Sequence, residues 1–188
     1  MNDTEKYDVI LADPPWTFSV YNAAKSPKHA SHQYGLMSTD DICKLTVPAA
    51  DNCALFLWAT WPNILDAFRV IEAWGFTYRT LAWSWVKLNK SSMGFFTGMG
   101  YYTRSNTEPC LLAVRGRMPV QAHDVQALIC TPVRAHSRKP DEQYDKIERL
   151  YPNMRYLEMF ARYKRPVWSS WGNEIESDVQ LPFDVRQP

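Results

Sequence analysis

Four consecutive residues, Asp13-Pro14-Pro15-Trp16, place a carboxylate, two prolines and an aromatic ring directly after a short apolar run. Each proline fixes φ, lacks an amide donor and pushes the preceding residue toward an extended conformation. The resulting rigid turn offers acceptors, and these suit a planar –NH2 group. One amine proton would go to the Asp13 carboxylate and the other to the Pro14 carbonyl, which helps to localise the nitrogen lone pair, while Trp16 stacks on the ring that carries the amine. The alternative interpretation is a structural turn that ends a strand and places Trp16 in the core.

Patterns for other kinds of chemistry are weak. His29 and His32 are three residues apart, but no cysteine or carboxylate stands at zinc-ligand spacing, so we expect no metal. No Gly-x-Ser-x-Gly elbow or Cys-His signature supports hydrolysis. The cysteines are scattered without a C-x-x-C pair, which favours reduced thiols over a disulfide framework; they are Cys43, Cys53, Cys110 and Cys130.

Length and composition predict one domain over residues 1–188, with a core at about 6–175 and a loose C-terminal tail. The 188 residues are 46% apolar and 22% charged, which is ordinary for a globular protein. No apolar run approaches the roughly 18 residues of a membrane span. The N-terminus lacks a basic-then-apolar signal pattern, so we expect a cytoplasmic location.

The net charge of +1 says nothing about nucleic acid binding, but the distribution of the charged residues along the chain does. Basic residues concentrate between positions 101 and 170, and a local basic face can bind phosphates. These basic residues are Arg104, Arg115, Arg117, Arg134, Arg138, Lys139, Arg162, Lys164 and Arg165. For any one of them, a solvated charge on the surface is an equally good explanation. Aromatic residues reach 14%, and most should fill the core. Trp16 and Trp61 each stand beside a proline in a predicted loop and are candidates for binding.

Hydrophobic patterning predicts alternating strands and helices, hence an α/β fold with a mostly parallel sheet. Long loops are expected at 17–36 and at roughly 87–107, where such loops are often functional. Ser38 should cap a short helix in a capping box with Asp41, and Gly75 should end a helix that begins at Pro62. A further helix is predicted over 140–151, and the strands over 7–12, 53–59, 76–86, 109–114, 125–130, 155–160 and 167–171.

Three loops should meet at one edge of this sheet. Ligands of parallel α/β sheets bind outside the carboxyl ends of the strands. Residues 13–16, 60–62 and 161–165 each follow a predicted strand, so we expect an acidic, aromatic loop to face a basic one.

Several blocks of the chain resemble, in order, the MT-A70 family of adenine N6-methyltransferases. The resemblance covers residues 8–175 and rests on independent motifs, so it is specific. The blocks are Asp13–Trp16, Tyr34–Ser38 (YGLMS), Leu55–Trp58 (LFLW), Trp85–Lys87 (WVK), Ser137–Glu142 (SRKPDE), Glu158–Arg162 (EMFAR) and Trp168–Glu174 (WSSWGNE).

This resemblance implies a Rossmann-like, S-adenosylmethionine-dependent methyltransferase fold in permuted order, with the catalytic loop first and the cofactor strand late. It implies catalytic roles for Asp13, Pro14, Pro15 and Trp16. Cofactor contacts are implied for Asp13, Lys139, Glu158, Phe160, Arg162, Asn173 and Glu174, with Lys139 near the methionine carboxylate. Candidates for substrate contacts are Trp16, Trp61, Lys87, Tyr101, Tyr102, Arg104 and Arg134.

The chain departs from the family pattern in two places. It begins too late for a strand that many relatives carry before the Asp-Pro-Pro-Trp strand, and Val167 stands where a glycine often precedes the tryptophan. We expect no separate target-recognition domain, so the two long loops should choose the substrate.

Three alternatives remain beside adenine methylation in DNA, which we favour. The substrate could be RNA instead, which a requirement for the 2′-hydroxyl would reveal. The chain could be an inactive nucleic-acid-binding subunit of a methyltransferase complex, although Asp13, Lys139, Asn173 and Glu174 are all present. Cytosine-N4 methylation is chemically close, but such enzymes usually carry serine in place of Asp13. A homodimer and a heteromeric partner are both compatible with the sequence.

Overall fold

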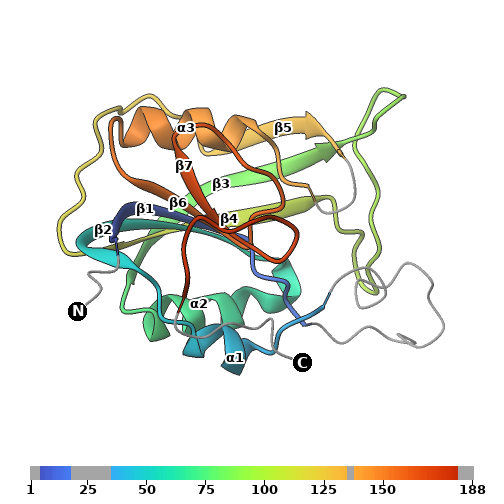
Figure 1. The fold of residues 1–188 in the computed structure, drawn as a ribbon. Helices are drawn as coiled ribbons and strands as arrows, with labels where there is room; N and C mark the ends of the chain where they lie inside the picture. The colour runs from blue at the N-terminus through green and yellow to red at the C-terminus, as the bar shows by residue number, and fades with distance from the viewer. Residues whose placement is uncertain (1–4, 18–34, 135–137, 182–188) are drawn as a thin grey trace.

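A computed structural model describes residues 5–17, 35–134 and 138–181 and shows an α/β fold built on a seven-stranded sheet (Figure 1). The strand order is β5-β3-β4-β2-β1-β6-β7. The bounds are β1 Tyr7–Ala12, β2 Ala49–Trp58, β3 Thr77–Leu88, β4 Thr107–Arg115, β5 Leu128–Pro132, β6 Tyr156–Met159 and β7 Trp168–Trp171.

The sheet is parallel except at β4. Strand β1 lies between β2 and β6 and is parallel to both, β6 is parallel to β7, and β3 is parallel to β5. Strand β4 is antiparallel to both of its neighbours, β2 and β3. The mostly parallel sheet predicted from the sequence is confirmed, and β4 is inserted antiparallel because it returns directly from β3 without a helical crossover.

Helices cover both faces of the sheet. Helices α1 (Thr39–Lys44) and α2 (Ile64–Ala73) lie on one face, and α3 (Glu142–Leu150) lies on the other (Figure 1). The predicted N-cap is confirmed, because the Ser38 hydroxyl accepts the Asp41 amide at 3.1 Å; the Asp41 carboxylate accepts a hydrogen bond from the same hydroxyl at 2.7 Å. Helix α2 is preceded by a 3-10 turn, Trp61–Asn63, and ends just before Gly75 as predicted.

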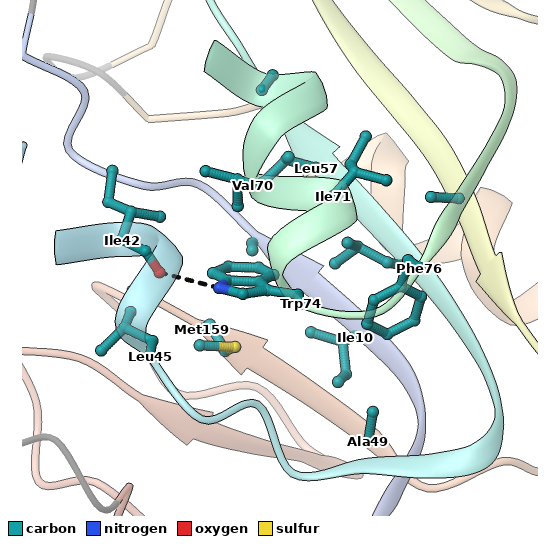
Figure 2. Packing of buried hydrophobic residues seen from close by; sticks show 14 of the residues in the cluster. Ile10, Ile42, Leu45, Ala49, Leu57, Val70, Ile71, Trp74, Phe76 and Met159 are labelled. Carbon is teal, nitrogen blue, oxygen red and sulfur yellow. Dashed lines mark hydrogen bonds between the residues drawn. The ribbon is translucent and has the colours of Figure 1, made fainter. Parts of the chain in front are cut away.

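The buried side chains form two clusters, one on each side of the sheet. Alternation along β2 sends Leu55 and Leu57 toward α1 and α2, and Phe56 and Trp58 toward α3. This burial on both faces explains why the central strands read as continuous apolar runs. Trp74, at the end of α2, links the two helices of its face, since its indole donates to the Ile42 carbonyl at 2.9 Å (Figure 2).

Several element boundaries differ from those predicted. Strand β2 begins at Ala49 because Tyr7 of β1 pairs with it there, although Asp51 and Asn52 interrupt the apolar run. Strand β5 is shifted toward the C-terminus, because its register pairs Leu128–Pro132 with the end of β3. Most of the predicted 17–36 loop, both histidines of the 29–32 pair and residues 182–188 of the C-terminal tail lie outside the described residues. Among the described helices, none has the length and apolar character that crossing a membrane requires.

Candidate active site

A cavity of about 280 Å³ opens at the carboxyl ends of β1 and β6. Chain order reverses at this point, because β1 is followed by β2 on one side while β6, from late in the sequence, lies on the other. Crevices of this kind are where open α/β sheets bind ligands. The residues around it come from the loops after β1 and β6, from the segment before α3 and from α3 itself; they include Asp13, Trp58, Arg138, Lys139, Tyr144, Glu158, Phe160, Arg162 and Lys164.

The Asp13 carboxylate lies on one wall of the cavity and is held by Lys139. The Lys139 ammonium is 2.7 Å from each carboxylate oxygen and also lies over the Trp58 ring, 5.4 Å from its centroid. The Lys139 side chain is 13% exposed and that of Asp13 30%. Burial raises the pKa of Asp13, and the Lys139 ammonium opposes that rise. Lys139 therefore favours the ionised form of a carboxyl group that its surroundings would tend to protonate.

Glu108, which the sequence analysis missed, extends this pair into a chain of alternating charges. Its carboxylate lies 3.4 Å from Lys139 and forms a close ion pair with Lys87. Although burial alone would raise it, the two ammonium groups hold the pKa of Glu108 below its usual value. Asp13, Lys139, Glu108 and Lys87 thus form a partly buried cluster without net charge. The sequence did contain a sign of this role: Glu108 stands at the start of the otherwise apolar run 107–114, and a buried carboxylate there needs a cationic partner.

The loop of Asp13, Pro14, Pro15 and Trp16 is rigid, but not in the way predicted. The Trp16 amide donates to the Pro14 carbonyl at 2.8 Å, so one acceptor position of that carbonyl is already used. The Trp16 ring is only 5% exposed and its indole donates to the Trp58 carbonyl at 3.0 Å. The base-stacking role predicted for Trp16 is therefore wrong, because packing against the core encloses its ring. Trp16 instead anchors the loop that carries Asp13.

Glu158 stands at the end of β6, on the opposite wall. It accepts a hydrogen bond from the Tyr144 hydroxyl at 2.9 Å. Burial raises the pKa of Glu158 to about 7, with the nearby Asp13 carboxylate adding to the rise and the Tyr144 hydrogen bond opposing it. Phe160 follows with a positive φ of 63° and packs edge-on against Trp171. Tyr144 is a further residue of the site that sequence reasoning did not single out.

The two late blocks of the chain lie side by side. The Ala161 amide donates to the Trp171 carbonyl at 2.9 Å, which brings the loops after β6 and β7 together. Arg162 and Glu174 form an ion pair across these loops, with Nε 2.7 Å from Oε1, and Asn173 is exposed next to it. Arg162 lines the cavity, and its ion pair with Glu174 brings the loop after β7 next to it.

The groups on the walls fit a ligand that carries both charge signs. Asp13 and Glu158 offer carboxylates to an ammonium or sulfonium group, while Arg138 and Lys164, which pair with Asp141 and Asp178, are cations that line the same cavity. S-adenosylmethionine carries these charges. Within the described residues no cluster of three or more His, Cys, Asp or Glu side chains could hold a metal ion.

The residues predicted to contact substrate differ in their exposure. Trp61, Tyr101, Tyr102 and Arg104 are exposed. Lys87 faces inward, toward Glu108.

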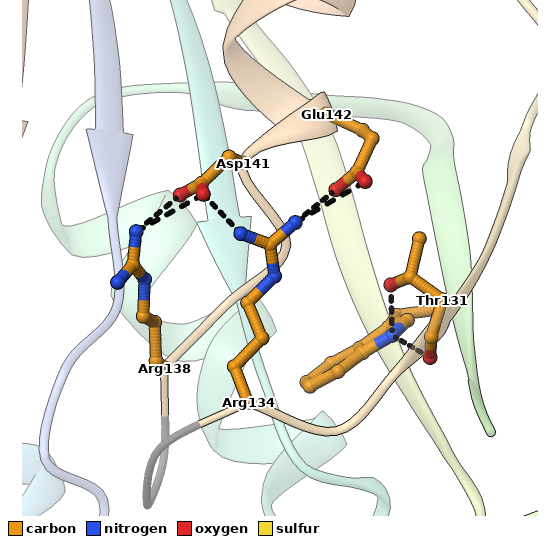
Figure 3. A network of polar contacts seen from close by, with 6 residues as sticks. Thr131, Arg134, Arg138, Asp141 and Glu142 are labelled. Atoms are coloured by element: carbon orange, nitrogen blue, oxygen red, sulfur yellow. Dashed lines mark hydrogen bonds and ion pairs between the residues drawn. The ribbon is translucent and has the colours of Figure 1, made fainter. Parts of the chain in front are cut away.

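Arg134 was also predicted to contact substrate, but it is occupied by carboxylates at the start of α3. Its guanidinium pairs with Asp141 and lies 3.0 Å from Glu142, while Arg138 shares Asp141 (Figure 3). The acidic first turn of α3 accounts for this, since carboxylates at a helix N-terminus attract nearby cations.

Comparison with known proteins identifies relatives along nearly the whole chain. The MT-A70 family model matches residues 7–174. The chain is 32% identical to the Type II methyltransferase M.MunI of Mycoplasma sp, over 95% of this chain and 82% of that protein. It is 32% identical to the N(6)-adenosine-methyltransferase catalytic subunit METTL3 of Homo sapiens and 34% identical to the N(6)-adenosine-methyltransferase MT-A70-like protein of Arabidopsis thaliana. The match to the Homo sapiens protein includes 97% of this chain but only 32% of that protein. The match to the Arabidopsis thaliana protein includes 90% of this chain and 24% of that protein.

Proposed function

The chain belongs to the MT-A70 family of S-adenosylmethionine-dependent methyltransferases, and we propose that it methylates the N6 amine of adenine in nucleic acid, with DNA as the favoured substrate. The observation that carries this proposal is the Asp13 carboxylate, held by Lys139 on the wall of a cavity whose other groups suit the cofactor.

Asp13 acts on the amine. The lone pair of an exocyclic amine is delocalised into the base, so the nitrogen is a weak nucleophile. An ionised Asp13 accepts one N6 proton, orients the amine and helps to localise its lone pair. The second proton has a further acceptor in the free lone pair of the Pro14 carbonyl. When bound, S-adenosylmethionine supplies an electrophilic methyl group. The amine becomes acidic as it is alkylated, so its proton passes to Asp13 or to water without a strong base.

Lys139 keeps Asp13 able to accept that proton. The ammonium is 2.7 Å from both carboxylate oxygens, so it offsets the burial that raises the Asp13 pKa. Glu108 in turn keeps Lys139 paired on its other side, at 3.4 Å. Lys139 was also predicted to contact the methionine carboxylate; its ammonium already contacts both Asp13 oxygens and Glu108, so a cofactor carboxylate would have to share these donors.

The remaining cofactor contacts come from the loops after β6 and β7. We assign Glu158 to a positively charged group of the cofactor, since its carboxylate lines the cavity and lies near Asp13. Arg162, Asn173 and Glu174 offer the donors and acceptors that ribose hydroxyls and an adenine edge require. Phe160, held by Trp171, supplies apolar surface beside them.

The preference for DNA rests on the Type II methyltransferase M.MunI, which is matched over 82% of that protein's length. The relatives named N(6)-adenosine-methyltransferases are matched over a third of their length or less. We therefore favour DNA, and RNA is the second candidate.

The test offers tritiated S-adenosylmethionine with unmethylated duplex DNA, single-stranded DNA and RNA, followed by nucleoside mass spectrometry. We expect N6-methyladenine in DNA above that in RNA. If N6-methyladenine forms in RNA alone, the substrate is RNA and not DNA. If N4-methylcytosine forms, the target base is cytosine and not adenine. If no product contains a methylated base, the chain is not an independent enzyme, and the proposal fails. The Lys44→Met variant, which changes an exposed lysine of α1, is assayed beside the wild type and should give the same products in the same amounts.

A further inference from the structure

The segment between β3 and β4, residues 89–106, projects beyond the sheet at the right-hand side of the molecule (Figure 1). Its side chains are unusual for a surface segment. Large apolar or aromatic residues are exposed along it: Met93, Phe95, Met99, Tyr101 and Tyr102. Lys90 and Arg104 are its charged residues, and it contains no aspartate or glutamate. Aromatic rings combined with positive charge are the composition of surfaces that bind nucleic acid bases.

Residues 98–105 of this segment form a closed turn, which follows the hairpin that the Asn89 amide closes on the Gly94 carbonyl. The Gly98 amide donates to the Ser105 carbonyl at 2.8 Å, and the Ser105 amide donates to the Met99 carbonyl at 3.2 Å. A Cβ at Gly98 would lie 2.2 Å from the Ser105 carbonyl oxygen, and one at Gly100 would lie 1.9 Å from that of Thr103. Only glycine permits so close an approach of two backbone segments. The sequence therefore provides the two residues that close this turn.

The closed turn displays two tyrosines. Tyr101 is 82% exposed and Tyr102 is 94% exposed. Their rings meet edge to face, with centroids 5.0 Å apart and an interplanar angle of 86°. Arg104 donates to the Gly100 carbonyl at 3.2 Å, which places a cation beside the rings. Such exposure of two large rings on an ordered turn has no role in packing the core.

The base of the segment is connected to the catalytic carboxylate. The Phe96 amide donates to the Lys87 carbonyl at 2.8 Å, and Lys87 pairs with Glu108 at the start of β4. Glu108 pairs with Lys139, which holds Asp13. The segment that carries the turn therefore has its root in the charge cluster of the active site.

We propose that the turn of residues 98–105 is a base-stacking wedge, which inserts the Tyr101 and Tyr102 rings into a nucleic acid duplex beside the target adenine. This inference rests on the proposed function and deepens it. An adenine must leave the base stack to reach Asp13, and this step costs free energy in a duplex but little in a single strand. Rings that occupy the vacated stack offset that cost. Lys90 and Arg104 meet the phosphates.

The test compares the Tyr101→Ala/Tyr102→Ala double variant with the wild type on two forms of one substrate. These are native unmethylated plasmid DNA and the same DNA after heat denaturation, with N6-methyladenine quantified by nucleoside mass spectrometry. If RNA is the substrate, the two forms are an RNA duplex and its separated strand. We expect the ratio of duplex to single-strand activity to fall at least about tenfold, because stacking on an aromatic side chain stabilises a base by an amount that corresponds to roughly that factor or more.

Two control variants distinguish stacking by the rings from a general effect of changing surface residues. The Tyr101→Phe/Tyr102→Phe variant keeps both rings and should restore the ratio, and Leu65→Ala, on the exposed face of α2, should keep it at the wild-type value. An unchanged ratio in the double alanine variant overturns the wedge. A change in its molar mass by light scattering does so as well, because the turn would then be a contact between protein subunits.

Failure of the proposed function is a separate outcome. A wild type without activity on either form refutes the proposed function. Fluorescence anisotropy with a labelled DNA duplex then tests the wedge by itself. The double alanine variant should bind the duplex at least about tenfold more weakly than the wild type, and equal binding overturns the inference.

Discussion

Replacement of Lys139 by methionine removes one charge from the alternating cluster and should destabilise the fold in a pH-dependent way. The side chain volume is nearly kept, but Asp13 and Glu108 lose the ammonium that lies 2.7 Å and 3.4 Å from their oxygens. Two carboxylates would then share a partly buried site with Lys87 alone. The variant should therefore unfold more easily than the wild type near neutral pH.

The size of the effect follows from exposure. Removing one partner of a fully buried pair costs about 3–5 kcal/mol, whereas exposed pairs contribute about 0–1 kcal/mol. Side-chain exposures of 13% for Lys139, 18% for Glu108 and 30% for Asp13 place the cluster between these limits. We expect a loss of about 2 kcal/mol in the free energy of unfolding. The midpoint of urea unfolding should fall by about 1 M.

The dependence on pH has a definite sign. In the wild type the pKa of Asp13 is raised by burial, and that of Glu108 is held low by its two lysines. Without Lys139 both values move upward, so the folded variant binds protons more readily than its unfolded chain. Protonation then relieves the repulsion, and the destabilisation should be largest near pH 8 and smaller near about pH 5.

Urea unfolding of both proteins at these two pH values tests the reasoning. Lys44→Met is the matched control, because its lysine forms a 3.1 Å ion pair with Asp41 at the surface, and it should change stability by less than about 1 kcal/mol at either pH. A Lys139→Met effect no larger than that of the control, or one that is equal at both pH values, would refute the account of the cluster.

Three further predictions concern individual residues. Asp13→Asn should lower methyl transfer by about 10²–10⁴-fold while S-adenosylmethionine affinity, measured calorimetrically, changes only severalfold; near-wild-type turnover would remove Asp13 from the mechanism. Because the pKa of Glu158 is about 7 and its carboxylate is the form that attracts a cation, cofactor binding should strengthen as pH rises through about 7. Glu158→Gln should abolish that dependence, and a retained dependence would assign it to another group. Trp16→Phe removes the hydrogen bond to the Trp58 carbonyl and should cost about 1–3 kcal/mol, a fall of several degrees in melting temperature; an unchanged value contradicts the anchoring role.

The sequence by itself determined the parts of this protein that depend on local chemistry. Two prolines after YDVILA require a strand that ends in a rigid turn, and Ser38 with Asp41 specifies the start of α1. The order of the motifs indicated the family and its cofactor before any contact between them was known.

Only the tertiary structure decided which groups meet and which rings are enclosed. Lys139 reaches Asp13 across 126 positions. Glu108 joins them because β4 lies between β3 and β2 in the sheet. The prolines beside Trp16 indicated a loop, but they could not indicate that its ring faces the core, whereas Tyr101 and Tyr102 face solvent. Exposure depends on what packs against a residue, and that is set by the arrangement of the sheet and helices, not by local sequence.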